Sequence, residues 1–242
     1  LKRQIPIRTF SDWNDVEPGF FEADLVAHCG VDPSGRFLNT LVLIDIATSW
    51  TECFALLQKG EAEVIAAIQK AQDLLPIAIL GFDSDNGSEF INELLYSYCL
   101  TEKITFTRSR PYKKNDQAHV EQKNWTHVRH LFGYDRIDDV TLIPLMNDLY
   151  ANEWSLYQNH FCPGMKLVEK QRVNAKYQKR YDAPKTPYQR LLDSPHIDED
   201  TKSWIRDVHQ TLDPFILKQV IEKKLTRIFR QIRVTSNVRQ RL

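Results

Sequence analysis

The 242-residue chain carries 32 basic and 32 acidic side chains, and 42% of its residues are hydrophobic. This composition excludes a disordered or fibrous chain and fits one or two globular domains with a hydrophobic core. No apolar run approaches the roughly 18 residues that cross a bilayer, so we expect no membrane partner. The four cysteines form no C-x-x-C pair, which predicts buried thiols in a reducing, cytoplasmic compartment and argues against structural zinc.

The neutral total conceals two parts of opposite charge. Residues 1–104 hold 7 basic and 16 acidic side chains, whereas residues 105–242 hold 25 basic and 16 acidic ones. A basic excess confined to one part of a chain is typical of contact with a polyanion such as nucleic acid.

Strands and helices alternate along the first part of the chain. Apolar runs predict five strands, over residues 19–29, 36–50, 51–57, 77–82 and 104–108. Apolar residues at helical spacing predict two intervening helices, over 61–75 and 91–100. The order β-β-β-α-β-α-β favours an α/β fold, with a mixed five-stranded sheet covered by helices on both faces.

Two helices and a basic arm are expected next. Asn115 or Asp116 is a candidate N-cap for a helix over 117–132, and a longer helix is expected over 140–160. Residues 165–190 contain eight Lys and Arg residues and three tyrosines but only two acidic residues. We interpret this stretch as a basic, mostly extended arm.

The C-terminal region is predicted to be helical, with one helix over 198–212 and another that begins at Asp213-Pro214. Seven apolar residues form one stripe on the last helix: Leu217, Val220, Ile221, Leu225, Ile228, Phe229 and Ile232. The stripe either packs on the core, which is the commoner outcome, or forms a partner interface.

The predicted elements divide the chain into three parts: a lead-in over 1–18, an α/β core over 19–163, and the basic arm with the C-terminal helices over 164–242.

Three carboxylates are expected to converge in this topology. Asp24 lies within the first strand, Asp85 follows the fourth, and Glu121 lies on the helix after the fifth. Sites in open α/β sheets favour the carboxyl ends of strands, and clustered carboxylates are stabilised by oxygen-ligated Mg²⁺ or Mn²⁺. The spacing alone is weak evidence, because about one Asp–Glu pair at any chosen spacing is expected by chance, and Asp-Asn-Gly is an ordinary turn sequence.

The sequence around these carboxylates is more specific. Asp85 stands in SDNGSEF, Glu121 stands in RPYKKNDQAHVEQKN with 35 residues between the two, and the first strand reads DLVAHCG. These strings closely resemble the catalytic core of retroviral integrases and bacterial insertion-sequence transposases, the D,D-35-E family, over roughly residues 19–160. The resemblance is closest to the bacterial transposases.

This resemblance implies a ribonuclease-H-like fold in which Asp24, Asp85 and Glu121 hold two Mg²⁺ or Mn²⁺ ions per active site. It implies DNA cleavage and transfer of a 3′-OH end into target DNA. It also implies a homodimer or a higher assembly on paired DNA ends.

Three neighbouring residues have alternative interpretations. Asp83 shares a strand face with Asp85 and is its main rival, although the DNG-S-x-F match favours Asp85. His28 lies on the same strand face as Asp24, where it either orients a metal-bound water, contacts the scissile phosphate, or is a hydrogen-bonded structural histidine. Asn86 is expected to shape the turn or to contact DNA.

Basic residues around the predicted site are candidate phosphate contacts. Two groups are expected to hold DNA, one near the Glu121 helix and one in the arm: Arg108, Arg110, Lys113, Lys114, Lys123 and Arg129, and Lys176, Lys179 and Arg180. For Lys123 and Arg129, a solvated helix face is an equally good interpretation.

The leading hypothesis is a metal-dependent DNA transposase or integrase catalytic domain. A ribonuclease-H-like nuclease that cuts without joining is one alternative. A catalytically silent DNA-binding protein derived from a transposase is another.

Overall fold

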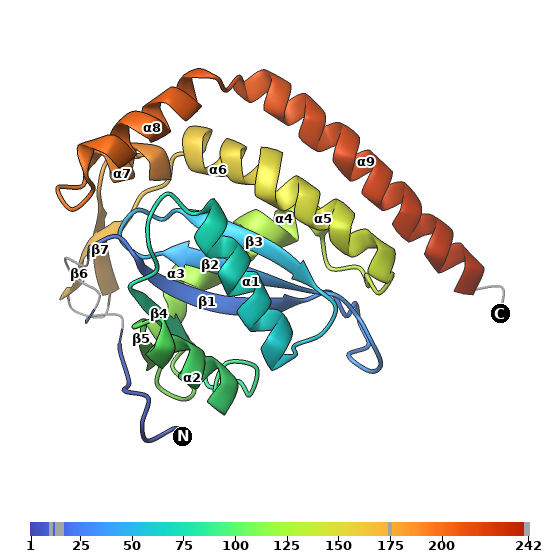
Figure 1. Cartoon of the computed structure of the whole chain (residues 1–242), viewed down its shortest axis with the longest axis horizontal. Coiled ribbons are helices and arrows are strands. Elements are labelled where there is room, and N and C mark those ends of the chain that lie inside the picture. The colour runs from blue at the N-terminus through green and yellow to red at the C-terminus, as the bar shows by residue number, and fades with distance from the viewer. Residues whose placement is uncertain (10–11, 13–16, 174–175, 240–242) are drawn as a thin grey trace.

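The computed structural model describes residues 1–9, 12, 17–173 and 176–239, without the side chains of residues 114, 115, 170, 173 and 234–239 (Figure 1). Its centre is a five-stranded sheet of order β3-β2-β1-β4-β5. The strands are β1 (Phe20–Ala27), β2 (Asn39–Asp45), β3 (Thr51–Leu56), β4 (Gly81–Ser84) and β5 (Thr105–Arg108). The first three are antiparallel, and β4 and β5 run parallel to β1. The predicted mixed sheet is therefore present.

Two predicted strand boundaries differ from the structure. The run 36–50 contains only β2, because Asp45 caps the turn that follows: its carboxylate accepts from the N–H and hydroxyl of Thr48. The fourth strand begins at Gly81 and ends at Ser84, later than the apolar run 77–82 suggested. Ile77 and Ile79 pack into the core without entering the sheet ladder.

Helices cover both faces of the sheet (Figure 1). On one side lie α1 (Glu61–Leu74) and α2 (Glu93–Thr101). The other side carries two longer helical runs, each interrupted by a π-helical stretch. These runs are η2 (Lys114–Gln117), α3 (Ala118–Lys123), η3 (Asn124–Arg129) and α4 (His130–Phe132), followed by η4 (Val140–Leu142), α5 (Ile143–Leu149), η5 (Tyr150–Trp154) and α6 (Ser155–Phe161).

The strands divide their side chains between two hydrophobic clusters. Phe21, Ala23 and Leu25 of β1 belong to the cluster beneath α1 and α2. Val26 belongs to the cluster beneath the opposite helices. Since successive strand residues point to opposite faces, Glu22 and Asp24 lie on the face of Val26, which α3 covers.

The predicted basic arm is a two-stranded antiparallel hairpin, followed by a short helix. Its elements are β6 (Leu167–Val173), β7 (Lys176–Tyr181) and α7 (Pro187–Asp193). Every side chain of β7 is exposed. Strand β7 therefore projects its basic residues into solvent.

The C-terminal helices α8 (Glu199–Gln210) and α9 (Pro214–Arg239) pack on the core. Asp213 caps α9 as expected, with its carboxylate accepting from the N–H groups of Phe215 and Ile216. The apolar stripe of α9 joins the cluster beneath α5, with Ile221 and Ile228 fully buried. Core packing is thus the outcome for this stripe. Within the described residues, no helix combines the length and apolar content needed to span a bilayer.

Candidate active site

The sheet register places Asp24 beside Asp85. In the parallel β1–β4 pair, Glu22 lies opposite Asp83 and Ala23 lies opposite Ser84. Asp24 and Asp85 are the next residues on each strand, at the carboxyl end of β4. Side chains two residues apart share a face, so Glu22, Asp24, Asp83 and Asp85 all belong to the α3 side of the sheet.

The helix run that starts at α3 brings Glu121 to the same place. Asp24, Asp85 and Glu121 line one surface hollow of about 570 Å³. Basic and polar side chains complete its wall, among them Lys2, Asn86, Arg110, Tyr112, Lys113 and Gln117. The three predicted carboxylates therefore share one opening to solvent.

Asp24 is the most buried of the three. Its Oδ1 accepts from the N–H of Leu25 at 2.8 Å, and its Oδ2 accepts from the side-chain amide of Asn124 at 2.7 Å. Burial raises the pKa of Asp24 to about 6, against the lowering effect of these bonds. The charge on Asp85 contributes a further rise of that pKa. A cation in the hollow would relieve both effects.

Asp85 is held by the turn that follows β4. Its Oδ1 accepts from the N–H of Gly87 at 2.8 Å, and burial raises its pKa. A Cβ atom at Gly87 would lie 2.9 Å from this Oδ1 and 2.6 Å from a carboxylate oxygen of Glu89. A larger residue at position 87 would therefore displace the side chains of Asp85 and Glu89.

Two residues that the sequence did not single out hold the Glu121 helix against β1. The Oε2 of Glu22 accepts from the N–H of Val120 at 2.9 Å, and Asn124 bonds Asp24 as described. Glu121 thus lies between two attachment points on the same strand. A charged residue in an otherwise apolar strand, two positions before Asp24, was the sequence signal for Glu22.

Asp83 is fully buried and does not line the hollow. Its Oδ1 accepts from the hydroxyl of Thr107 at 2.6 Å, and burial raises its pKa to about 7. His28 is equally buried, with its Nε2 2.8 Å from the hydroxyl of Thr40. The structure places His28 in the core as a hydrogen-bonded histidine, outside the hollow.

The basic residues near the Glu121 helix differ in role. Lys113 is exposed, and Arg110 forms a two-point ion pair with Asp116, at 2.7 and 2.8 Å. Both line the hollow. Arg108 donates to the side-chain oxygen of Asn86 and to main-chain carbonyls near the N-terminus. It therefore links the turn after Asp85 to the N-terminal segment of the chain.

The other predicted DNA contacts lie elsewhere. Arg129 donates to the carbonyl of Ala27 at 3.0 Å and covers the ring of Tyr134, so its guanidinium is bound within the fold. Lys123 leaves the helix on the side away from Glu121 and lines a different pocket. The side chain of Lys114 lies outside the described residues. Three cations project from the exposed strand β7: Lys176, Lys179 and Arg180.

The donor set fits a hard divalent cation in its chemistry, because all three side chains are carboxylates in one solvent-connected hollow. The side-chain oxygen of Asn124, which does not line the hollow, is buried and has no hydrogen-bond partner among the described residues. As placed in the structure, and among the residues that it describes, no three His, Cys, Asp or Glu side chains form a group that could hold a metal ion.

Comparison with known sequences matches residues 17–114 to the integrase core domain. This stretch contains Asp24 and Asp85 and ends before Glu121. The uncharacterized protein y4rM of Sinorhizobium fredii (strain NBRC 101917 / NGR234) is 46% identical over 190 residues, covering 78% of this chain and 54% of that protein. The chain thus spans about half the length of this curated relative.

Two solved structures are similar in fold. The simian T-cell lymphotropic virus intasome in complex with PP2A regulatory subunit B56 gamma aligns with a TM-score of 0.54 at 18% identity, over 79% of this chain and 59% of that chain. The HTLV-2 integrase catalytic core domain in complex with magnesium (dimeric form) aligns with a TM-score of 0.46 at 16% identity, over 72% of this chain and 97% of that chain. The first of these alignments, together with the order of the sheet, confirms the predicted fold.

Proposed function

Because residues 17–114 match the integrase core domain, we propose that this chain is the catalytic part of a DNA transposase or integrase. It would cut a phosphodiester at a DNA end and join the resulting 3′-OH to target DNA. One observation carries the proposal: Asp24, Asp85 and Glu121 line a single hollow together with the cations Arg110 and Lys113.

Asp24, Asp85 and Glu121 would hold two Mg²⁺ or Mn²⁺ ions. When bound, such ions supply Lewis-acid activation of the nucleophile and stabilise the charge on the leaving oxygen. Asn124 and the N–H of Gly87 keep the Asp24 and Asp85 carboxylates oriented toward the hollow. The hydrogen bond from the N–H of Val120 to the carboxylate of Glu22 fixes the position of Glu121 along β1.

The chain's own cations would bind the DNA backbone. Lys113 projects at the mouth of the hollow, and Arg110 presents a guanidinium that Asp116 holds in a fixed orientation. The exposed hairpin cations Lys176, Lys179 and Arg180 extend this basic surface. Such contacts position a duplex without reading its sequence.

A second copy of the chain is part of the proposal. Insertion of an element requires both of its ends to be joined to the target, and two copies would supply an active site for each end. We expect the full chain to form dimers or larger assemblies on DNA in the cytoplasm, and light scattering with and without duplex measures this.

The deciding experiment supplies Mn²⁺, a target plasmid and a fluorescent duplex with a recessed 3′-OH and randomised terminal sequence. Covalent joining of duplex to plasmid is the expected result, and Asp85→Asn and Glu121→Gln should abolish it. Asp73→Asn, on the exposed surface of α1, is the matched control and should join normally.

Other outcomes identify the alternatives. Plasmid nicking without joining would favour a nuclease. Absence of both reactions, together with no Mn²⁺ binding by calorimetry, would favour a catalytically silent DNA-binding protein. Full joining activity in Asp85→Asn or Glu121→Gln would refute the site assignment.

A further inference from the structure

A second pocket lies behind the Glu121 helix, on the side that Glu121 does not face. It has a volume of about 530 Å³ and lies between the α3–η3 helix, the end of α6, the start of β6 and helix α7. This volume falls within the range of small-ligand sites, about 300–1,000 Å³. Six lining residues are basic or titratable nitrogen side chains: His119, Lys123, His127, Lys166, Lys185 and Arg190. No Asp or Glu is among the described residues that line it.

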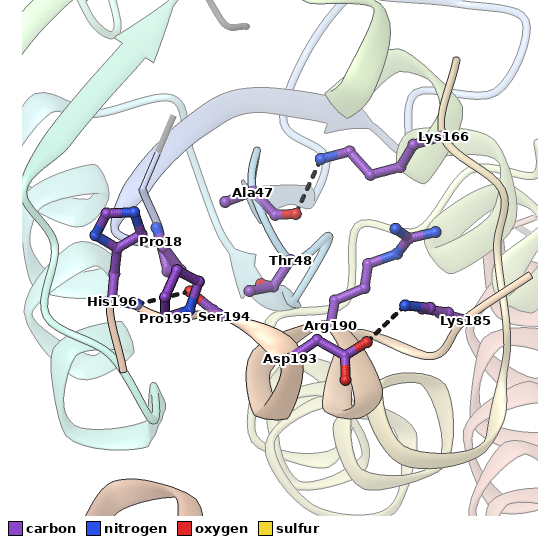
Figure 2. A pocket seen from close by; sticks show the side chains of 10 residues that line it. All are labelled: Pro18, Ala47, Thr48, Lys166, Lys185, Arg190, Asp193, Ser194, Pro195 and His196. Carbon is purple, nitrogen blue, oxygen red and sulfur yellow. Dashed lines mark hydrogen bonds and ion pairs between the residues drawn. The ribbon is translucent and has the colours of Figure 1, made fainter. Parts of the chain in front are cut away.

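Three of the four Lys and Arg residues are anchored at the pocket wall. Arg190 donates to Asp182 and to the carbonyl of Gly164 at 2.9 Å. Lys185 pairs with Asp193 at 2.6 Å. These bonds fix two cationic groups that also border an adjoining pocket, where Figure 2 shows the Lys185–Asp193 pair and the nearby guanidinium of Arg190.

Lys166 is the third anchored cation. Its ammonium donates to the carbonyls of Ile46 and Ala47 at 2.6 and 2.9 Å, and the second bond is drawn in Figure 2. An ammonium has three donors, so one remains for another acceptor. Lys166 lines both pockets, which makes it part of the wall between them.

Lys123 is the exception. It follows Glu121 by two residues, so its side chain leaves the helix roughly 200° away. Within the described part of the chain, its ammonium has no hydrogen bond or ion pair. Its side chain lines the pocket together with Lys166 and Arg190.

From this arrangement we propose that the pocket between α3–η3, α6, β6 and α7 binds a phosphate group, with Lys123 as its central ligand and Lys166 and Arg190 beside it. Lys185 and Arg190 are paired with Asp193 and Asp182, so Lys123 and Lys166 supply the positive charge in this pocket that attracts an anion. Several donors that converge from different elements suit a tetrahedral anion with oxygens on every side, and lysine binds phosphate as a point charge. The proposal is independent of the catalytic function, because Glu121 and the pocket lie on opposite sides of one helix.

Titration of the full chain with inorganic phosphate in a chloride buffer tests the site by calorimetry. We expect saturable binding, and Lys123→Met should weaken it at least about tenfold, the loss typical of one charge-assisted hydrogen bond. Lys218→Met removes an exposed lysine of α9 and serves as the matched control with unchanged affinity. No phosphate binding by the wild-type chain, or equal binding by Lys123→Met, would overturn the proposal.

A measurement on the wild-type chain avoids dependence on a variant's folding. In a chain with isotope-labelled lysine side chains, addition of phosphate at constant pH should shift the NMR signal of the Lys123 side chain, because the anion contacts its ammonium. A Lys123 signal that phosphate leaves unchanged would contradict the proposal.

Competition then identifies the source of the phosphate. If a 20-base-pair duplex displaces inorganic phosphate, and Lys123→Met weakens duplex binding, the ligand is a backbone phosphate of DNA. If the duplex leaves phosphate binding unchanged, the ligand is a free phosphate or a small phosphomonoester. Either result supports a phosphate site, and neither depends on strand transfer.

Discussion

The side-chain amide of Asn124 donates to the Oδ2 of Asp24 across 2.7 Å and so joins the Glu121 helix to the central strand. The bond thus joins β1, which supplies Asp24, to the helix that supplies Glu121, the first and third of the proposed metal ligands. Since Asn124 follows Glu121 by three residues, the two lie on neighbouring positions of one helix face. The position of Glu121 relative to Asp24 therefore depends on a residue that need not touch DNA or metal.

Replacement of Asn124 by Ala should lower strand-transfer activity by about 10–100-fold, the typical cost of removing a group that orients a metal ligand. The bond also lowers the pKa of Asp24, so its loss should move the acidic limb of the pH–activity profile to higher pH. Asn152→Ala, at an exposed position of η5, is the control. An unchanged acidic limb would show that the bond does not influence the carboxylate.

Asp24→Asn should stabilise the metal-free chain at pH 8 by up to about 3 kcal/mol, because the folded chain then no longer buries this charge. The folded pKa of about 6 lies above the ordinary value of 3.8, so the penalty is absent below pH 3.8 and complete above pH 6. The difference in unfolding free energy between the two chains should therefore vanish at pH 3.5. Urea denaturation at both pH values measures it, and saturating Mn²⁺ should stabilise the wild type alone.

Glu22 should tolerate replacement by Gln but not by Ala. The amide oxygen of Gln can still accept from the N–H of Val120, whereas Ala leaves that buried donor without its partner and opens a cavity beneath α3. We expect Glu22→Ala to lose about 2–4 kcal/mol of stability and Glu22→Gln less than about 1 kcal/mol. Equal destabilisation by Glu22→Ala and Glu22→Gln would show that stability depends on the carboxylate charge of Glu22 rather than on its hydrogen bond to Val120.

The hairpin cations should contribute to DNA affinity without sequence preference. Replacing Lys176, Lys179 and Arg180 by Gln should weaken duplex binding equally for unrelated sequences. It should also reduce the slope of log affinity against log salt concentration by up to about 2.7, or about 0.9 per lost phosphate contact. Lys70→Gln with Lys103→Gln, both exposed in the core domain, is the control. A slope of log affinity against log salt concentration equal to that of the wild type would show that these three residues do not contact DNA phosphates.

Much of the fold could be predicted from the sequence because its signals are local. Apolar periodicity indicated the strand and helix order, and the Asp213-Pro214 pair marked the start of α9. The boundary errors have a common cause: Ile77 and Ile79 are buried in the core without being paired in the sheet. Apolar periodicity reports burial, whereas strand boundaries depend on which backbone groups find partners in the sheet.

The placement of individual basic residues could not be predicted in the same way. Arg110, Lys113 and Lys123 lie within 14 consecutive residues and have the same charge, yet two line the hollow of the carboxylates and one lines the pocket behind it. The side of a helix that faces the sheet depends on which residues anchor it, and here Glu22 and Asn124 do so. The basic arm was predicted to be extended, but its pairing into an antiparallel hairpin depends on contacts between its two halves.

By itself, then, the sequence determined the element order, the likeness to integrase and transposase cores, and the three candidate carboxylates, because these depend on local pattern and on motif. Only the tertiary structure decided that Asp83 and His28 are buried away from the hollow, that α9 packs on the core, and that Lys123 has no partner among the described residues. Each of these outcomes depends on the register between strands and on the packing of distant elements. Such relationships arise only when the chain has folded.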